Sequence, residues 1–148
     1  MKGTLSPLLG ELQFLEALVI SGMKQIGGSI LETLSKLVHL TQLVLEDNIL
    51  EGSIPSSLGQ LASVKTLSLG GNHLKGYIPS SLGNLHNLFQ LNLARNSLIG
   101  RIPAIFGNFH YSQSFDISYN LLSGFIPDFV GKFQNLTFID LSNNQFSG

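Results

Sequence analysis

The sequence predicts an α/β solenoid, in which one short structural unit is repeated along the chain. Three residue types recur with the same period of 24 residues. The asparagines of this series are Asn48, Asn72, Asn96, Asn120 and Asn144. The prolines are Pro55, Pro79, Pro103 and Pro127, and one glycine series is Gly52, Gly76, Gly100, Gly124 and Gly148. Because a fixed period of this length is the signature of stacked repeats, we expect function on a surface of the stack.

These series place the units on the chain. Full-length units start at residues 12, 37, 61, 85 and 109. A partial unit covers residues 3–11 and a truncated unit covers 133–148, so residues 1–148 are predicted to form a single domain. The unit that starts at residue 12 is one residue longer than the others, with Met23 near the asparagine position and Leu31 in place of the proline. We therefore expect the first units to be less regular than the rest.

A Leu-x-Leu tripeptide in each unit predicts a short strand. Alternate residues of a strand point to opposite faces, so Leu67 and Leu69 are expected to point inward. Thr66 and Ser68 are then expected to point outward. One such strand cannot bury its own apolar side, but units stacked about 4.8 Å apart form a parallel sheet with a continuous core.

The asparagine of each unit lies where the chain leaves the strand. Its side chain carries both donors and an acceptor, so stacked asparagines can satisfy backbone groups that are left free at this turn. Replacing a central member, Asn72 or Asn96, is expected to cost on the order of 1–3 kcal/mol through unsatisfied buried groups.

The remainder of each unit predicts an extended segment followed by a helical turn. In Gly-x-Ile-Pro, the proline biases the residue before it toward extended conformations. The Ser-Ser-Leu-Gly stretches at 56–59 and 80–83 then predict a short helical turn that closes with glycine.

The pattern Leu-x-Gly-x-Ile-Pro-x-x-Leu-Gly resembles the plant-specific class of leucine-rich repeats. In this chain it reads LKGYIPSSLGNL at 74–85 and LIGRIPAIFGNF at 98–109. That class is found in the ectodomains of plant receptor-like kinases and receptor-like proteins, and in secreted polygalacturonase-inhibiting proteins. The resemblance implies a right-handed leucine-rich-repeat superhelix, with a short parallel sheet on the concave face and short helical turns or 3-10 segments and loops on the convex side. It also implies a second short sheet at Gly-x-Ile-Pro, and recognition on the concave face.

The composition argues against two kinds of partner. Charged residues make up 11% of the chain and the net charge is -1. A nucleic-acid interface needs clustered Lys and Arg, so no nucleic-acid partner is expected. The longest apolar run, at 17–20, is far shorter than the roughly 20 residues of a membrane helix. No membrane contact by this segment itself is therefore expected.

The sequence contains no cysteine. Extracellular relatives in the class it resembles usually carry cysteine-bearing caps, and repeat proteins need polar caps for solubility. We therefore expect a segment of a longer protein or a degenerate short copy, with a cysteine-free cytosolic protein as the other option. The resemblance implies an extracellular or cell-surface location, as a plasma-membrane ectodomain or in the cell wall. Open ends predict marginal stability or self-association of the isolated chain.

The outward strand positions form columns across the units. One column changes from apolar to acidic along the chain, through Val19, Val44, Ser68, Asn92, Asp116 and Asp140. The predicted ligand-binding residues of the concave face are Lys65, Ser68, Phe89, Asn92, Arg95, Gln113, Asp116, Tyr119, Phe138 and Asp140. Phe89, Tyr119 and Phe138 are the expected anchors, since aromatic side chains dominate binding energy. Arg95 would pair with a carboxylate, and the aspartates with a basic group.

Catalysis and metal binding are not expected. Asp116 and Asp140 would lie about 5 Å apart on adjacent strands, a spacing that can serve glycoside hydrolysis or raise the pKa of one carboxyl. However, they lie on an open sheet, and Asn92 continues their column. His86 and His110 share another column, but a zinc site usually needs three or four ligands. We therefore predict no enzyme activity, no metal and no cofactor.

Asn135 begins the one Asn-x-Ser/Thr sequon of the chain and is a candidate glycosylation site if the protein is secreted.

Two functions remain open. The first is a non-catalytic module that binds a protein or peptide in the ectodomain of a receptor-like protein or kinase, where the partner is a ligand or a co-receptor of signalling or defence. The alternative is an inhibitor of a secreted cell-wall hydrolase such as polygalacturonase. A scaffold or decoy without a ligand is a third reading.

Overall fold

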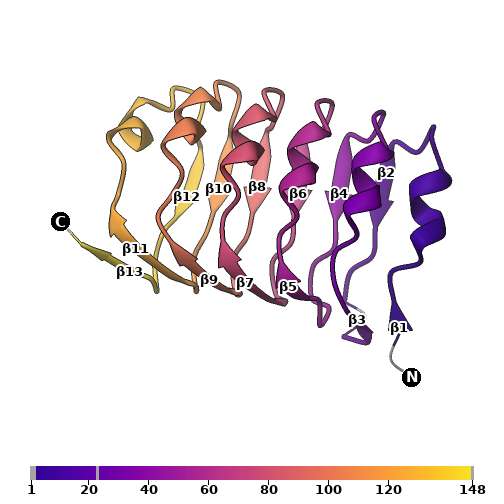
Figure 1. The fold of residues 1–148 in the computed structure, drawn as a ribbon. Coiled ribbons are helices and arrows are strands. Elements are labelled where there is room, and N and C mark those ends of the chain that lie inside the picture. Colours follow the sequence, from indigo (N-terminus) through magenta and orange to yellow (C-terminus); the bar gives the residue numbers. More distant parts are fainter. Residues whose placement is uncertain (1–2, 23, 148) are drawn as a thin grey trace.

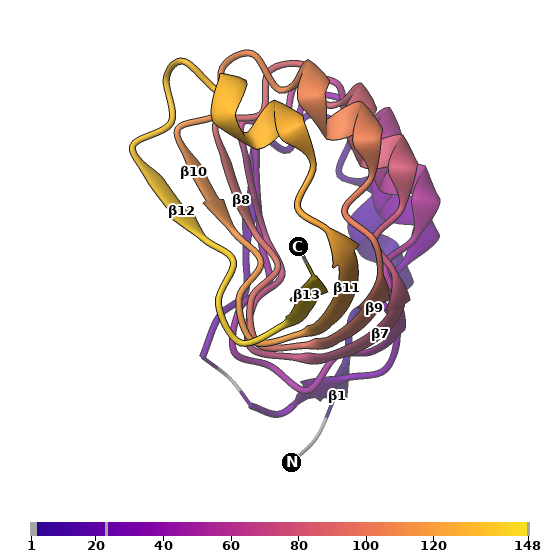
Figure 2. The ribbon, with the colours of Figure 1, turned by 90° about the vertical axis from the view of Figure 1, so that its left-hand side faces the viewer.

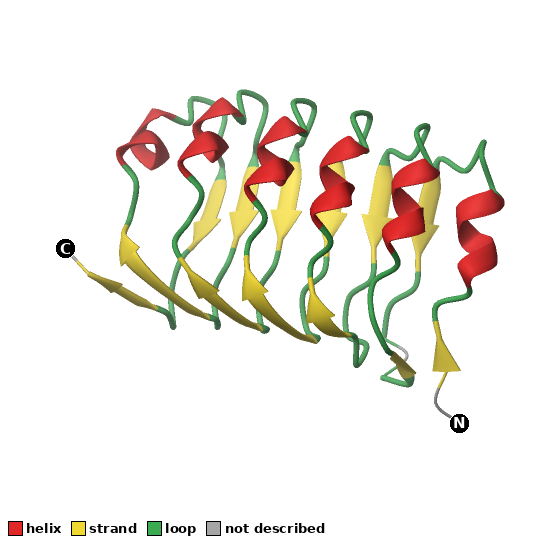
Figure 3. Cartoon of the chain, in the orientation of Figure 1, coloured by secondary structure: helices red, strands yellow, loops and turns green. Residues whose placement is uncertain are grey.

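The computed structural model describes residues 3–22 and 24–147. The units stack side by side in one curved array, with the two termini at opposite ends (Figure 1). One row of strands lines one side of the stack, and the short helices and a second row of strands line the other (Figures 2 and 3). The expected solenoid, with a parallel sheet on one side and helical turns on the other, is therefore confirmed. Met23, where the sequence suggested a shift in register, lies outside the described residues.

The larger sheet contains one strand from each of six successive units, all parallel. In stack order its strands are β12 (Phe138–Asp140), β10 (Ser114–Asp116), β8 (Gln90–Asn92), β6 (Thr66–Ser68), β4 (Gln42–Val44) and β2 (Ala17–Val19). Equivalent residues of neighbouring units pair directly, as Leu67 does with Leu91. Leu67 and Leu69 point inward and are buried, as expected from the alternation.

A second sheet follows the turn at the ladder asparagines, as the resemblance implies. Its five parallel strands are β5 (Glu51–Ser53), β7 (His73–Tyr77), β9 (Ser97–Gly100), β11 (Leu121–Phe125) and β13 (Gln145–Ser147). In the first units a separate pair, β1 (Gly3–Thr4) and β3 (Ile26–Gly27), takes this place. Gly100 shows why this sheet needs glycine, since its φ is 82° and a Cβ there would collide with the ring of Tyr77.

In the described part of the chain, six 3-10 helices lie on the side opposite the larger sheet (Figure 2). They are η1 (Pro7–Glu11), η2 (Glu32–Lys36), η3 (Ser56–Gln60), η4 (Ser80–Asn84), η5 (Ala104–Asn108) and η6 (Asp128–Lys132). The repeat proline is the residue before the helix from η3 onward, with φ of -64° at Pro55, close to the value that its ring fixes. Within residues 3–22 and 24–147, no helix is long and apolar enough to cross a membrane.

The glycine of Ser-Ser-Leu-Gly has a different role from the expected one. It does not close the helix: Gly59 lies inside η3, and Leu61 is the C-cap residue. Gly59 is buried, and a Cβ there would collide with the backbone carbonyl of Ser81 in η4. The glycine therefore lets neighbouring 3-10 helices pack closely, a requirement that comes from the stack and not from the helix end.

The asparagine ladder connects successive units through buried hydrogen bonds. The Asn72 side-chain amide donates to the carbonyls of Leu45 and Leu69, at 2.9 and 3.0 Å. Its Oδ1 accepts from the N–H of Leu50 at 3.1 Å. The equivalent contacts recur at Asn96, Asn120 and Asn144. The ladder thus satisfies the backbone groups of the turn, as the sequence predicted.

The ladder ends imperfectly at the N-terminal side. The amide of Asn48 donates to the carbonyl of Ile20 at 2.8 Å, but its Oδ1 is buried without a hydrogen-bond partner among the described residues. The unit before it is the longer, irregular one. Within the described residues, this irregular unit thus offers no partner to that one polar atom of the ladder.

Candidate functional site

The outward side chains of the larger sheet line three adjoining hollows. The flank hollow has a volume of about 520 Å³ and is lined by Thr41, Gln42, Lys65, Thr66, Asn87, Phe89 and Tyr111. The central hollow (about 360 Å³) is lined by Val44, Glu46, Thr66, Leu67, Ser68, Gln90, Leu91, Asn92, Ser114, Asp116 and Phe138. The acidic hollow (about 240 Å³) is lined by Glu46, Asp47, Gly70, Gly71, Asn92, Ala94, Arg95, Asp116, Ser118, Tyr119 and Asp140. Shared lining residues join each hollow to the next, so together they cross the face of the sheet.

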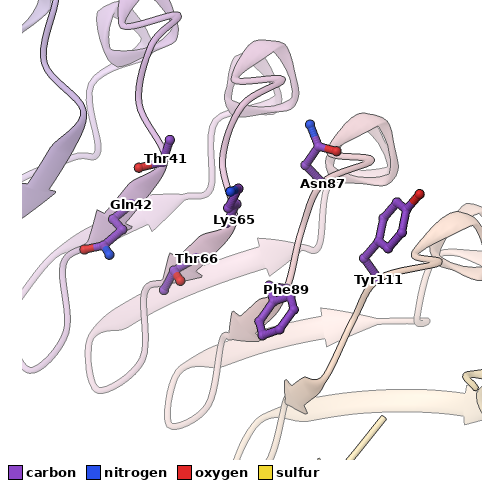
Figure 4. Close-up of a pocket in the computed structure, with 7 residues that line it drawn as sticks. All are labelled: Thr41, Gln42, Lys65, Thr66, Asn87, Phe89 and Tyr111. Atoms are coloured by element: carbon purple, nitrogen blue, oxygen red, sulfur yellow. The ribbon is translucent and has the colours of Figure 1, made fainter. Parts of the chain in front are cut away.

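The flank hollow presents two aromatic rings and one cation. Lys65 and Phe89 come from the residues just before β6 and β8, while Asn87 and Tyr111 come from the turns that precede the strands (Figure 4). Phe89 is 41% exposed and Tyr111 is 59% exposed. The backbone of Phe89 is held between neighbouring units, since its N–H donates to the carbonyl of Lys65 at 2.7 Å and its carbonyl accepts from the N–H of Gln113 at 2.8 Å. Two accessible rings side by side suit the apolar anchor of a ligand.

The central hollow is already partly satisfied within the protein. Ser68 faces outward, but it is only 4% exposed, because its hydroxyl donates a hydrogen bond to the carboxylate of Glu46. Asn92 accepts a hydrogen bond from the N–H of Ala94 at 2.9 Å. Against the expectation of an exposed side chain, Ser68 is therefore covered. The Glu46 carboxylate occupies the surface that the sequence assigned to the serine.

The acidic hollow is formed by four carboxylates and one guanidinium, those of Glu46, Asp47, Asp116, Asp140 and Arg95. Asp116 on β10 and Asp140 on β12 occupy matching register positions of adjacent strands, so the expected neighbour relation is confirmed. The surplus of negative charge at this edge contrasts with the flank hollow, whose lining includes a lysine and no carboxylate. The two edges of the face therefore favour ligand groups of opposite charge.

Both aspartates are engaged in the turn that follows their strand. Asp140 accepts hydrogen bonds from the Ser142 hydroxyl at 2.5 Å and from the Ser142 N–H at 3.0 Å. Both hydrogen bonds hold the pKa of Asp140 below its ordinary value, and the bond from the hydroxyl contributes more than the bond from the N–H. Asp116 makes the same two contacts with Ser118. The raised pKa that a catalytic pair would need is therefore not found at Asp140, which stays ionised.

The residue before each ladder asparagine adopts a left-handed backbone. The φ value is 55° at Asp47, 57° at Arg95, 54° at Tyr119 and 57° at Asn143, and Gly71 takes the same place with a φ of 70°. Gly, Asn and Asp tolerate this region, whereas arginine and tyrosine are disfavoured there. Arg95 and Tyr119 thus depart from the residue types that the turn prefers. Both line the acidic hollow, which supports a role in binding.

The structure gathers most of the predicted residues into the three hollows. Gln113 is the exception and lines none of them. Asn87 and Tyr111 line the flank hollow, and Glu46 and Asp47 line the acidic hollow, but the sequence analysis did not include them among the predicted binding residues. Tyr111 could have been found from the sequence, because it occupies the same place in its unit as residues 63 and 87, and this place varies from unit to unit. No group of three or more potential metal-binding side chains occurs in the part of the chain that the structure describes.

Comparisons of the sequence identify the repeat type. Models of the leucine rich repeat match residues 38–98, 113–133 and 135–148. No curated protein matches the sequence significantly.

Solved structures of plant ectodomains are similar over nearly the whole chain. One is the ectodomain of the membrane receptor kinase GASSHO1/SCHENGEN3 from Arabidopsis thaliana, in complex with Casparian strip integrity factor 2, with a TM-score of 0.94 and 38% identity over 97% of this chain and 17% of that one. Another is the Arabidopsis receptor kinase HAESA in complex with an IDA peptide hormone, with a TM-score of 0.94 and 34% identity over 99% of this chain and 25% of that one. The chain thus spans a quarter or less of the length of these ectodomains.

A plant ice-binding protein is also similar, with a TM-score of 0.78 and 33% identity over 98% of this chain and 54% of that one. The same repeat architecture therefore occurs in proteins with very different binding partners. The outward side chains, and not the fold, must distinguish these partners.

Proposed function

The chain belongs to the leucine-rich-repeat family, with the 24-residue unit of plant extracellular proteins, and from this premise we propose that it is a non-catalytic module whose concave face binds an extended peptide or a protein segment. The observation that carries the proposal is the row of three adjoining hollows on one rigid sheet. The similar HAESA ectodomain was solved with a peptide hormone ligand, which supports a ligand of this kind.

An extended peptide matches the layout of the face. Alternate side chains of an extended chain point to opposite sides. A peptide that crosses the parallel strands would therefore direct one set of side chains to the flank hollow and the other to the acidic hollow. Phe89 and Tyr111 would hold an apolar or aromatic side chain, with Lys65 beside them for an acidic group. The carboxylates of the acidic hollow would hold a basic side chain.

For the whole protein, we propose a place in the ectodomain of a receptor-like protein or kinase at the plant cell surface. Two similar structures are ectodomains of receptor kinases from Arabidopsis, which supports that location. In such a protein this module would contribute binding, to a ligand or a co-receptor, and signalling would come from other parts of the receptor. Inhibition of a secreted cell-wall hydrolase remains the alternative, because it would use the same concave face.

The test compares two pairs of exposed aromatic residues. The chain is immobilised and incubated with a peptide fraction from plant extracellular fluid, and retained peptides are identified by mass spectrometry. Synthetic copies are then titrated by calorimetry. Changing Phe89→Ala together with Tyr111→Ala is expected to weaken binding tenfold or more, because loss of a hot spot costs about 2 kcal/mol or more.

The matched control changes Tyr77→Ala together with Phe125→Ala on the second sheet, where both rings are exposed and outside the three hollows. Its binding is expected to equal that of the unchanged protein. Equal loss in both double variants, or loss in the control alone, would refute the concave-face proposal. Retention of a polygalacturonase, with loss of its activity on titration, would support the inhibitor alternative instead.

A further inference from the structure

A small cavity lies between η5 and η6, the last two 3-10 helices of the described chain. It has a volume of about 210 Å³, and its apolar wall is formed by the side chains of Phe109, Phe129 and Phe133. The helices lie on the side opposite the larger sheet, so this cavity is separate from the three hollows of the concave face (Figure 2). It is therefore a candidate for a second binding site.

The end of η6 differs from the end of η5. At the end of η5, Phe109 donates its N–H to the carbonyl of Phe106 at 3.1 Å, and its side chain is buried. Phe133 holds the equivalent place after η6, but its backbone is extended, with a ψ of 103°, and it makes no such bond among the described residues. Phe133 is only partly buried, and it lines the cavity.

The aromatic wall is held from behind by the core. The ring centroid of Phe133 lies 6.2 Å from that of the fully buried Phe115 and 5.5 Å from that of Phe129. On the side of η5, a Cβ on Gly107 would lie 3.3 Å from the Cβ of Phe129, so the glycine lets Phe129 pack close to this helix. Tilted rings at these distances are a favourable arrangement. The wall is thus a preformed apolar surface that suits one further aromatic ring.

Three polar side chains line the same cavity, those of His110, Lys132 and Gln134, and no carboxylate does so among the described residues. All three polar residues are exposed. Lys132 supplies a positive charge, and Gln134 offers an amide for hydrogen bonds. A mainly apolar wall with a few polar groups is the usual composition of a small-molecule site. The charge of the lining favours a ligand with a negative group.

We propose that the cavity between η5 and η6 binds a small aromatic carboxylate. The ring of the ligand packs against Phe129 and Phe133, and its carboxylate accepts a hydrogen bond from Lys132. The volume of about 210 Å³ limits the ligand to one ring with a short acid chain, because drug-sized ligands occupy pockets of about 300–1,000 Å³. Binding at this cavity does not depend on the function proposed for the concave face.

The first test titrates phenylacetate, phenylacetamide and acetate into the isotope-labelled chain and follows its backbone amide signals by NMR. Phenylacetate carries both a ring and a charge, and each of the other probes lacks one of them. For phenylacetate, we expect saturable shifts at Gly107, His110 and 129–134, half complete at about 1 mM or below. Phenylacetamide and acetate should each bind about threefold more weakly or worse. Shifts that do not saturate, shifts confined to other residues, or equal binding of phenylacetate and phenylacetamide would overturn the proposal.

The second test changes Lys132→Met, which removes the charge and keeps an unbranched side chain. Phenylacetate should bind about threefold more weakly, because an exposed ion pair contributes modestly, and phenylacetamide should bind as before. The matched control is Lys36→Met, since Lys36 ends η2 as Lys132 ends η6, and both are exposed. The control should bind both probes as the unchanged protein does, and unchanged amide signals in the rest of the chain show that both variants are folded. Equal binding of phenylacetate by the two variants would overturn the proposal.

Discussion

The inward and outward faces of the six parallel strands differ in how strongly stacking constrains them. Inward, Leu43, Leu67 and Leu91 repeat the same residue at the same register and are fully or almost fully buried. Outward, the residues just before the strands change from Lys65 to Phe89 in adjacent units. An inward side chain must pack against the units on both sides, so a change in one unit disturbs three. An outward side chain meets solvent and is free to vary.

The comparison teaches that agreement between units reports the fold, whereas disagreement between units reports the surface available for binding. The same contrast holds at the turn. The ladder asparagines are identical, but the residue before them changes from Gly71 to Arg95 to Tyr119. If this separation is correct, inward changes should mainly affect stability, and outward changes should mainly affect binding.

The largest effect is expected from the centre of the inward face. Leu91 has no exposed surface, so Leu91→Ala should lower the free energy of unfolding by about 2–5 kcal/mol through lost burial and a cavity. Its outward neighbour on the same strand provides the control, and Gln90→Ala should change stability by about 0.5 kcal/mol or less. Urea unfolding followed by circular dichroism measures both. Equal losses would show that the two faces are not separable.

The asparagine ladder gives the next largest effect. Asn96→Ala removes bonds to the carbonyls of Leu69 and Leu93 and to the N–H of Leu74, so stability should fall by about 1–3 kcal/mol. Asn87→Ala is the matched control, because that exposed asparagine makes one long contact of 3.3 Å. Thermal unfolding of the two variants, side by side, should separate them by several degrees. A smaller loss for Asn96→Ala than for Asn87→Ala would contradict the ladder account.

Ser112 breaks the inward pattern, since it replaces the usual apolar residue of its column. It is buried, its hydroxyl has no partner in the described residues, and the nearby core contains Phe106 and Phe109 with ring centroids 4.7 Å apart. Phe106 and Phe109 stand where the preceding unit has Leu82 and Leu85, and we attribute the small residue at 112 to these larger rings. Ser112→Ala should therefore raise stability by about 1 kcal/mol. Ser112→Leu should lower it by about 1–3 kcal/mol through overpacking. A stabilising leucine in urea unfolding would refute this explanation.

The smallest effect is expected at the outward aspartates. The pKa of Asp140 is lowered from 3.8 by its bonds to Ser142, so its ionised form stabilises the folded state. That contribution is present above pH 3.8 and is lost as pH falls through the lowered pKa of the folded protein. Stability of Asp140→Asn should thus be slightly below that of the unchanged protein at neutral pH, and the difference should vanish in acid. A difference that grows on acidification would contradict the assignment.

Much of the fold follows from the sequence because it depends on positions that agree between units. The inward leucines, the ladder and the short helical turns are each set by local chemistry that is repeated several times. The role of Gly59 could not be derived in this way, since its constraint is the backbone of Ser81 one unit away. Contacts between different units are therefore the part of the fold that the repeat pattern does not contain.

The candidate site was predictable as a face but not residue by residue. The burial of Ser68 depends on the Glu46 side chain of the neighbouring unit, which no pattern within one unit reveals. Tyr111 lies in a turn that looks like a simple connection, yet the stack brings it beside Phe89. Side-chain conformation and neighbour identity thus decide which outward residues are open to a ligand.

The most direct test of the central claim places a photo-crosslinking phenylalanine analogue at position 89 or, in a second protein, at position 77. Both residues are exposed aromatics, one in the flank hollow and the other on the second sheet. After irradiation with a retained peptide, mass spectrometry should find the crosslink from position 89 and not from position 77, with both proteins unfolding at the same urea concentration. Crosslinking from position 77 alone would contradict the account, because recognition would then lie off the concave face.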